Sequence, residues 1–113
     1  MKKIQEFQAQ QIVFLQSGNI RLYTEVIQVI ESRQMCWVRP LILADLTALP
    51  PLVSDMRETS DLFWSIFLFQ PAFDTEVINL LSQVIRKDGK SETDSNAKEQ
   101  LHSFLRLICQ KEV

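Results

Sequence analysis

The sequence predicts an α+β fold, in which a small, strongly bent antiparallel β-sheet or an SH3-like barrel is followed by two C-terminal α-helices. Short runs rich in β-branched and aromatic residues, separated by polar breaks, occupy residues 12–69. After Pro71 the apolar residues recur at helical spacing instead. A chain of 113 residues suits a single domain, 1–113, with the sheet at about 12–69 and the helices at about 74–87 and 95–111.

The longest strand-like stretch runs from Ile20 to Leu43 and predicts a β-hairpin. Its tip is the polar segment 31–34, which lacks the Asn-Gly or Asp-Gly pair that fixes the register of a two-residue turn. The apolar run 12–15 before the hairpin predicts a short strand. Gly18 permits the positive φ that a tight reversal between these strands requires.

Proline residues mark the places where the sheet is expected to be interrupted. Pro40 lacks the N–H group that a ladder needs, so it predicts an edge, a bulge or the end of pairing. Pro50 and Pro51 end a connecting loop, and residues 52–56 after them are a candidate fourth strand. Residues 62–69 are a candidate fifth strand or an extended segment that covers the core. As a strand, this segment has apolar residues on both faces: Phe63, Phe67 and Phe69 on one, Trp64, Ile66 and Leu68 on the other.

Two later stretches have helical spacing. Asp74 suits the N-cap of the first helix, whose apolar residues include Val77, Leu81 and Val84. The polar segment 88–96 predicts a loop between the helices. The apolar stripe of the second helix consists of Leu101, Phe104, Leu105, Ile108 and Cys109. Because helices joined by a short loop commonly pack side by side, we expect an antiparallel helix pair.

The composition argues against several classes of partner. The formal net charge is −2, whereas proteins that neutralise many phosphates usually carry a basic excess, so we do not expect nucleic acid as a partner. The most apolar window, 62–73, is shorter than the roughly 20 residues of a membrane-spanning helix. The glutamine-rich N-terminal stretch is too polar for a signal peptide. We therefore expect a cytoplasmic protein with no membrane partner.

The sequence contains no catalytic or metal-binding motif, and we expect a protein that is not an enzyme and uses no cofactor. With Gly18 and Gly89 as its two glycines, the chain cannot form a glycine-rich phosphate-binding loop. Three carboxylates recur at three-residue intervals, Asp55, Glu58 and Asp61. We interpret them as a solvated loop face rather than as paired catalytic carboxylates.

His102, Cys36 and Cys109 are the remaining candidates for chemistry. A nucleophilic Cys–His pair needs hydrogen-bond contact, and Cys109 lies about two turns from His102 on the same helix, which is too far. A pair between Cys36 and His102 stays geometrically open. We interpret both cysteines as buried, reduced thiols, and the alternative is a disulfide between them if their Cα atoms lie within roughly 7 Å.

Aromatic residues provide the clearest functional signal. Trp37 and Arg39 share one strand face, either as an exposed stacking pair or as a buried Trp with Arg39 at the rim of the sheet. With Tyr23 and Trp64 they form the candidate interaction surface. This surface favours a non-enzymatic protein-interaction or accessory module, whose protein partner the sequence does not identify. The alternative is a single-stranded RNA-binding small barrel that uses Trp37, Arg39 and Tyr23 as a stacking platform.

Self-association is a further expectation. The predicted sheet has an edge that Pro40 protects only in part, and the segment 62–69 is apolar on both faces. A second copy would bury such an excess in a two-fold contact, so we favour a homodimer over a monomer in which both helices cover the sheet.

Three segments, Cys36–Leu41, Ser60–Leu62 and Phe69–Val77, resemble a group of small uncharacterised proteins from cyanobacteria. The resemblance implies a cytoplasmic protein of cyanobacterial origin. It implies no activity, cofactor, partner or site residue.

Overall fold

The computed structural model describes residues 7–86 and 94–112, and most of the predicted helix–helix loop, 88–96, lies outside them. The described strands are β1 (Ile12–Ser17), β2 (Ile20–Ile30), β3 (Met35–Asp45), β4 (Leu52–Asp55), β5 (Leu62–Ser65) and β6 (Gln70–Pro71). The helices are the short 3₁₀ helices η1 (Glu31–Arg33) and η2 (Ile66–Leu68) and the α-helices α1 (Asp74–Arg86) and α2 (Asp94–Glu112). The predicted α+β order, strands and then helices, is confirmed.

The six strands form one antiparallel sheet with the order β4-β3-β2-β1-β6. Strand β5 lies off this order and pairs with the first residues of β3, whereas β4 pairs with its last residues. Within the described residues no pairing joins β6 to β4 or β5, so the sheet is open. The bent antiparallel sheet is therefore the alternative that the structure confirms. Closure into an SH3-like barrel is not observed, because the two edges of the sheet do not pair.

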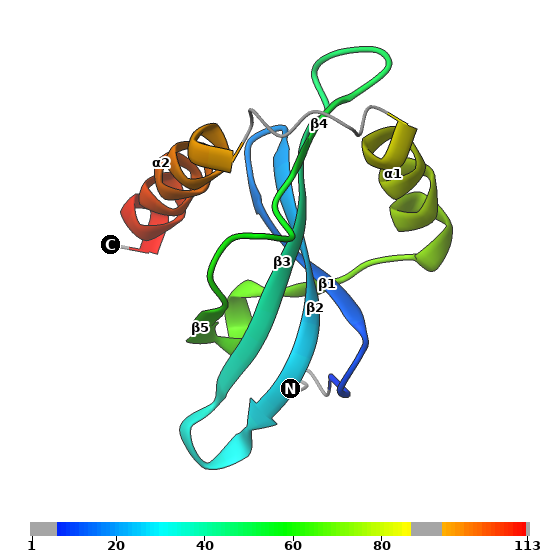
Figure 1. The fold of residues 1–113 in the computed structure, drawn as a ribbon. Helices are drawn as coiled ribbons and strands as arrows, with labels where there is room; N and C mark the ends of the chain where they lie inside the picture. Colours follow the sequence, from blue (N-terminus) through cyan, green and yellow to red (C-terminus); the bar gives the residue numbers. More distant parts are fainter. Residues whose placement is uncertain (1–6, 87–93, 113) are drawn as a thin grey trace.

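The hairpin formed by β2 and β3 is the longest element of the sheet, and its tip projects beyond both α-helices (Figure 1). Helix η1 closes the tip, where Gln34 has a φ of 55°. Gly18 has a φ of +61° in the tight turn before the hairpin, which is the conformation that the sequence predicted. We refer to residues 25–39 as the tip half of the hairpin, and to its remaining residues as the base half.

A β-bulge beside Pro40 changes the face to which the residues of β3 point. Tyr23 pairs with Ile42 and Thr24 pairs with Pro40, so Leu41 has no residue opposite it. Because side chains alternate along a strand, one extra residue reverses the alternation. Of the three alternatives predicted for Pro40, the bulge is the one that the structure contains.

The sheet has a hydrophobic core on each face. In β3, Cys36 and Val38 belong to the core under α2, whereas Ile42 and Ala44 belong to the core under α1. The buried helix residues are Ala97, Leu101, Phe104 and Ile108 of α2, and Val77, Leu80 and Val84 of α1. The two helices lie on opposite faces of the sheet (Figure 1), so the predicted antiparallel helix pair is wrong. Each helix buries its apolar stripe against the sheet instead of against the other helix.

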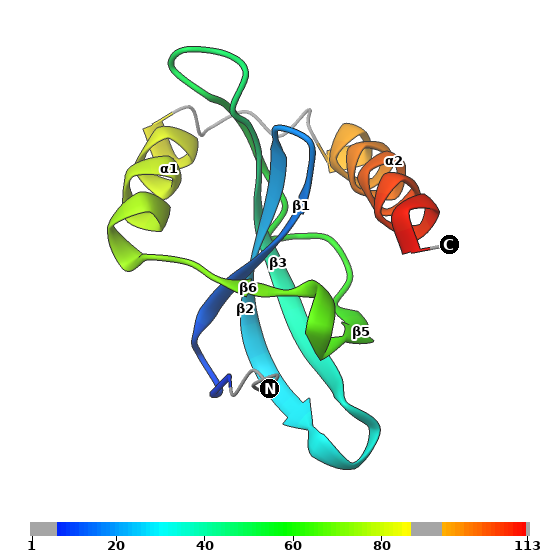
Figure 2. The ribbon, with the colours of Figure 1, turned by 180° about the vertical axis from the view of Figure 1, so that it is seen from behind.

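The predicted strand 62–69 ends early, at Ser65. The Oγ atom of Ser65 accepts a hydrogen bond from the N–H of Phe67 (3.3 Å), and η2 begins there. This 3₁₀ turn brings Phe69 into the core under α2, beside Ile66, and leaves Phe67 exposed. Ile66 and Leu68 share the face of Trp64 as predicted, so the predicted alternation is wrong only at Phe69. The chain then crosses to β1, with which β6 pairs (Figure 2). The segment 66–69 covers the tip half on the face that carries α2.

Candidate functional site

Helix α1 covers only the base half of its sheet face, and one carboxylate fixes its position. Glu76 Oε1 accepts a hydrogen bond from the N–H of Phe73 (3.3 Å), while Oε2 accepts from Arg21 Nη1 (2.9 Å) and from the hydroxyl of Tyr23. The guanidinium of Arg21 also lies 4.2 Å above the centre of the Phe14 ring. Burial, together with the hydrogen bond to Glu76, raises the pKa of Tyr23. Every hairpin residue in this core comes from the base half.

The tip half of the same face is not covered by a helix and carries two aromatic residues. Trp37 of β3 is paired with Phe63 of β5. Cys36 and Val38, on either side of Trp37 in β3, are buried on the opposite face, which carries α2. Because side chains alternate along a strand, Trp37 points to the face that carries α1. Trp37 is 38% exposed and Phe63 is 45% exposed, which leaves a cross-strand aromatic pair in contact with solvent.

Asp61, just before β5, connects this aromatic pair to a cation. The indole Nε1–H of Trp37 donates to Asp61 Oδ2 (3.0 Å), and Arg39 Nε lies 3.6 Å from Asp61 Oδ1. Exposed ion pairs contribute little to stability, so the main effect of this carboxylate is to hold the indole and the guanidinium side by side. We call Trp37, Arg39, Asp61 and Phe63 the open face.

The structure brings together two of the four residues predicted for the interaction surface. Trp37 and Arg39 are adjacent and exposed, which corresponds to the first of the two arrangements considered for them. Tyr23 is only 1% exposed and lies under α1, so it is not available as part of a stacking platform. Trp64 is partly buried and packs against the core on the opposite face, so it too lies outside the open face.

Phe63 and Asp61 are members of the open face that the sequence did not assign to it. Phe63 belongs to the aromatic segment, and Asp61 belongs to the carboxylate series. Their relation to Trp37 depends on the register between β3 and β5, which are distant in the sequence. A prediction of that pairing would have identified both residues.

The cysteines are free and lie in different environments. Cys36 is fully buried, and burial raises the pKa of its thiol to about 11. It is therefore a neutral thiol at physiological pH, whereas a nucleophilic cysteine needs its thiolate form. Cys109 is exposed, which corrects the interpretation of both thiols as buried. His102 is also exposed on α2, whereas Cys36 lies in the core.

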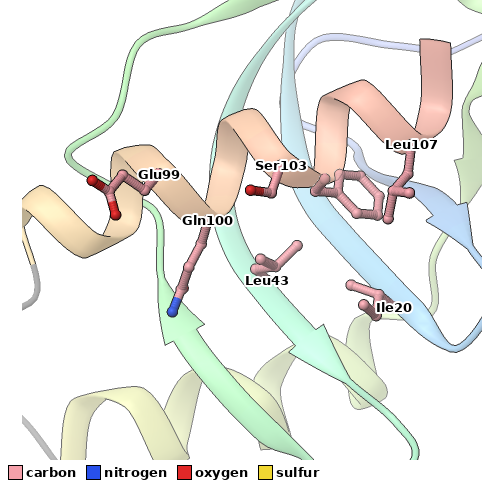
Figure 3. A pocket seen from close by; sticks show the side chains of 7 residues that line it. Ile20, Leu43, Glu99, Gln100, Ser103 and Leu107 are labelled. Atoms are coloured by element: carbon pink, nitrogen blue, oxygen red, sulfur yellow. The ribbon is translucent and has the colours of Figure 1, made fainter. Parts of the chain in front are cut away.

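A groove of about 360 Å³ lies between α2 and the base half of the hairpin. Figure 3 shows Gln100, Ser103 and Leu107 of α2 across from Ile20 and Leu43 of the sheet. Its walls are mainly apolar, and the remaining lining residues are Glu99 and Phe104. The groove contains no described histidine, cysteine or hydrogen-bonded polar cluster that would supply chemistry.

The described residues contain no group of three or more His, Cys, Asp or Glu side chains that could hold a metal ion. Asp55 pairs with Arg57 (2.9 Å) instead of with another carboxylate. Neither of the two described α-helices is long and apolar enough to cross a membrane.

Comparisons with protein-family models, with curated proteins and with solved structures gave no match. The function therefore has to be argued from the geometry of the open face.

Proposed function

We propose that this protein is a non-enzymatic interaction module that binds another protein through its open face. The observation that carries the proposal is the exposed cross-strand pair of Trp37 and Phe63, whose neighbour Asp61 holds Arg39 beside it. Tryptophan and arginine are enriched among the residues that dominate the energy of protein interfaces. Aromatic side chains held in place before binding lose less conformational entropy when a partner arrives.

Binding of single-stranded RNA is less well supported. Of the three residues proposed for a stacking platform, Trp37 and Arg39 are adjacent, but Tyr23 lies under α1. The carboxylate of Asp61 also lies beside the guanidinium of Arg39 and opposes the approach of a phosphate. A stacking site for several bases needs more aromatic residues and more positive charge than this face provides.

Capture of binding proteins by the immobilised chain tests the proposal. We expect Trp37→Ala and Phe63→Ala each to lower capture of a specific partner at least about tenfold, because truncating a central aromatic residue at an interface typically costs about 2 kcal/mol or more. Phe73→Ala is the matched control, since Phe73 is also an exposed aromatic residue but does not belong to the open face. Capture that is equal for all three variants would refute the proposed surface.

Titration with mixed single-stranded oligonucleotides separates the two functions. If the open face binds another protein, we expect the native chain to show no salt-dependent oligonucleotide binding that the Trp37→Ala substitution abolishes. Affinity that falls steeply between low and moderate salt, and that is lost in both Trp37→Ala and Arg39→Ala, would support RNA binding instead.

A further inference from the structure

The open face ends at β5, which is an edge of the sheet. Strand β5 pairs with β3 on one side, and in the described residues no strand pairs with its other side. An edge of this kind presents unpaired backbone groups to which a further strand can bind.

The register shows which backbone groups of β5 are free. The N–H of Ile66 donates to the carbonyl of Gln34 (2.9 Å), and the adjacent pair is Met35 with Ser65. Hydrogen-bonded and non-hydrogen-bonded pairs alternate along an antiparallel ladder. Met35–Ser65 and Trp37–Phe63 are therefore non-hydrogen-bonded pairs. The N–H and C=O groups of Phe63 and the N–H of Ser65 point away from β3, toward the open edge.

Strand β5 lacks the features that usually protect an edge. It contains no charged residue and no proline, and its pairing with β3 is regular. The other outer strands differ in this respect. Strand β4 ends at Asp55, which pairs with Arg57, and β6 contains Pro71. The unprotected edge is thus the one beside the open face.

We propose that β5 pairs with β5 of a second copy of this chain, antiparallel and about a two-fold axis at Phe63. Near a two-fold axis each side chain meets its own counterpart, so a charged strand would repel itself, whereas the uncharged β5 does not. In this register Phe63 lies opposite Phe63 of the second copy, and Asp61 lies opposite Ser65. No like charges are therefore opposed along the new strand pair.

The pairing has a consequence for the proposed function, because Phe63 belongs both to the open face and to the edge of β5 that pairs. In this respect the proposed dimer rests on the proposed function. The aromatic pairs of Trp37 and Phe63 in the two copies become one row across a continuous sheet. In the monomer, Trp37 and Phe63 expose roughly 200 Å² together, far less than the roughly 800 Å² that each partner of a stable interface buries. We therefore expect a weak, reversible dimer.

Sedimentation of the purified chain tests the dimer without any other protein. We expect the mean mass to rise toward that of a dimer between about 10 μM and about 1 mM, which is the range of a weak association. A chain that stays monomeric throughout this range would overturn the proposal, and the edge of β5 would remain open to an extended segment of another protein.

Ser65→Pro is the most direct variant. Ser65 has a φ of −59°, which proline adopts without strain, and its N–H points to the open edge rather than to β3. We expect Ser65→Pro to stay monomeric with an unchanged circular dichroism spectrum. Ser65→Ala is its control, because it removes the same hydroxyl but keeps the N–H, and it should dimerise like the native chain. Dimerisation of Ser65→Pro at the native concentration would contradict pairing through β5.

A charge exchange at Phe63 tests the position of the axis. Phe63→Glu and Phe63→Lys should each be monomeric, because two like charges would meet at the axis, and an equimolar mixture should recover the dimer. Failure of the mixture to associate while the native chain dimerises would place the contact elsewhere. The monomeric Ser65→Pro variant keeps the whole open face. If it still captures a protein that Trp37→Ala does not, the proposed function holds even where the dimer fails.

Discussion

The base half and the tip half of the β2–β3 hairpin belong to the same two strands but differ in what covers them. In the base half, Tyr23 lies under α1 and its hydroxyl is bound by Glu76. In the tip half, Trp37 lies on the same face, but α1 does not reach it. The comparison shows that an aromatic residue in this hairpin is buried or exposed according to whether a helix packs over it.

The covered face of the tip half should exclude solvent as fully as the base half does. Thiol labelling tests this, and it has the largest expected effect. Cys36 lies in the core beside Trp37, whereas Cys109 is exposed on α2. Cys36 can react only when the fold opens, so we expect it to react at least about 10³-fold more slowly than Cys109 at pH 8.

Mass spectrometry of peptides after timed labelling measures both rates in one sample. In denaturant the two cysteines should react at similar rates, which serves as the control. Rapid native labelling of Cys36 would mean that residues 66–69 do not hold the tip half closed.

Truncating the two aromatic residues should destabilise the fold unequally. Tyr23→Ala removes a fully buried ring under α1, and we expect a loss of about 3–5 kcal/mol in the free energy of unfolding. Trp37→Ala removes a partly exposed ring and one hydrogen bond, and we expect a loss below about 1.5 kcal/mol.

Urea unfolding followed by circular dichroism provides both values. Tyr23→Phe, which keeps the ring and removes only the hydroxyl, should lose about 1 kcal/mol and provides a reference if Tyr23→Ala does not fold. Equal losses for Tyr23→Ala and Trp37→Ala would remove the distinction between the two halves.

Alkaline pH should weaken the fold through the buried thiol. The pKa of Cys36 is raised from 9.0 to about 11, so above pH 9 the unfolded chain releases a proton that the folded chain keeps. The contribution of the neutral thiol to stability is complete below pH 9, and roughly 2–3 kcal/mol is lost as the pH rises from 9 to above about 11.

The raised pKa of Tyr23 acts in the same direction at higher pH. Urea midpoints measured between pH 8 and pH 11 should therefore decline, and they should decline less steeply in Cys36→Ala. An equal slope in both proteins would show that the thiol of Cys36 does not contribute.

Local features of the sequence predicted most of the fold. The hairpin follows from its β-branched runs, the tight turn follows from Gly18, and the helices follow from apolar spacing after Pro71. The position of the helices did not follow, because an apolar stripe such as that of α2 indicates burial but not against which face. The early end of β5 was not predicted, because the turn depends on the hydrogen bond that Ser65 Oγ accepts from the N–H of Phe67, and the sequence does not reveal this bond.

The candidate site could be predicted only in part, for a related reason. Trp37 and Arg39 are two residues apart in one strand, so alternation placed them on one face. Phe63 and Asp61 join them through a register between distant segments, which no local pattern specifies. Tyr23 has the same appearance in the sequence as an exposed aromatic residue, and only the docking of α1 buries it.

The bulge at Leu41 also affects how this chain should be compared with others. Up to Pro40, the even-numbered residues of β3 belong to the face that carries α2, and beyond it Ile42 and Ala44 belong to the face that carries α1. In a relative that lacks this single residue, Pro40 would be followed directly by Ile42, and the same residues would face the same cores with an unbroken alternation. An alignment scored on hydropathy must therefore place its gap at position 41.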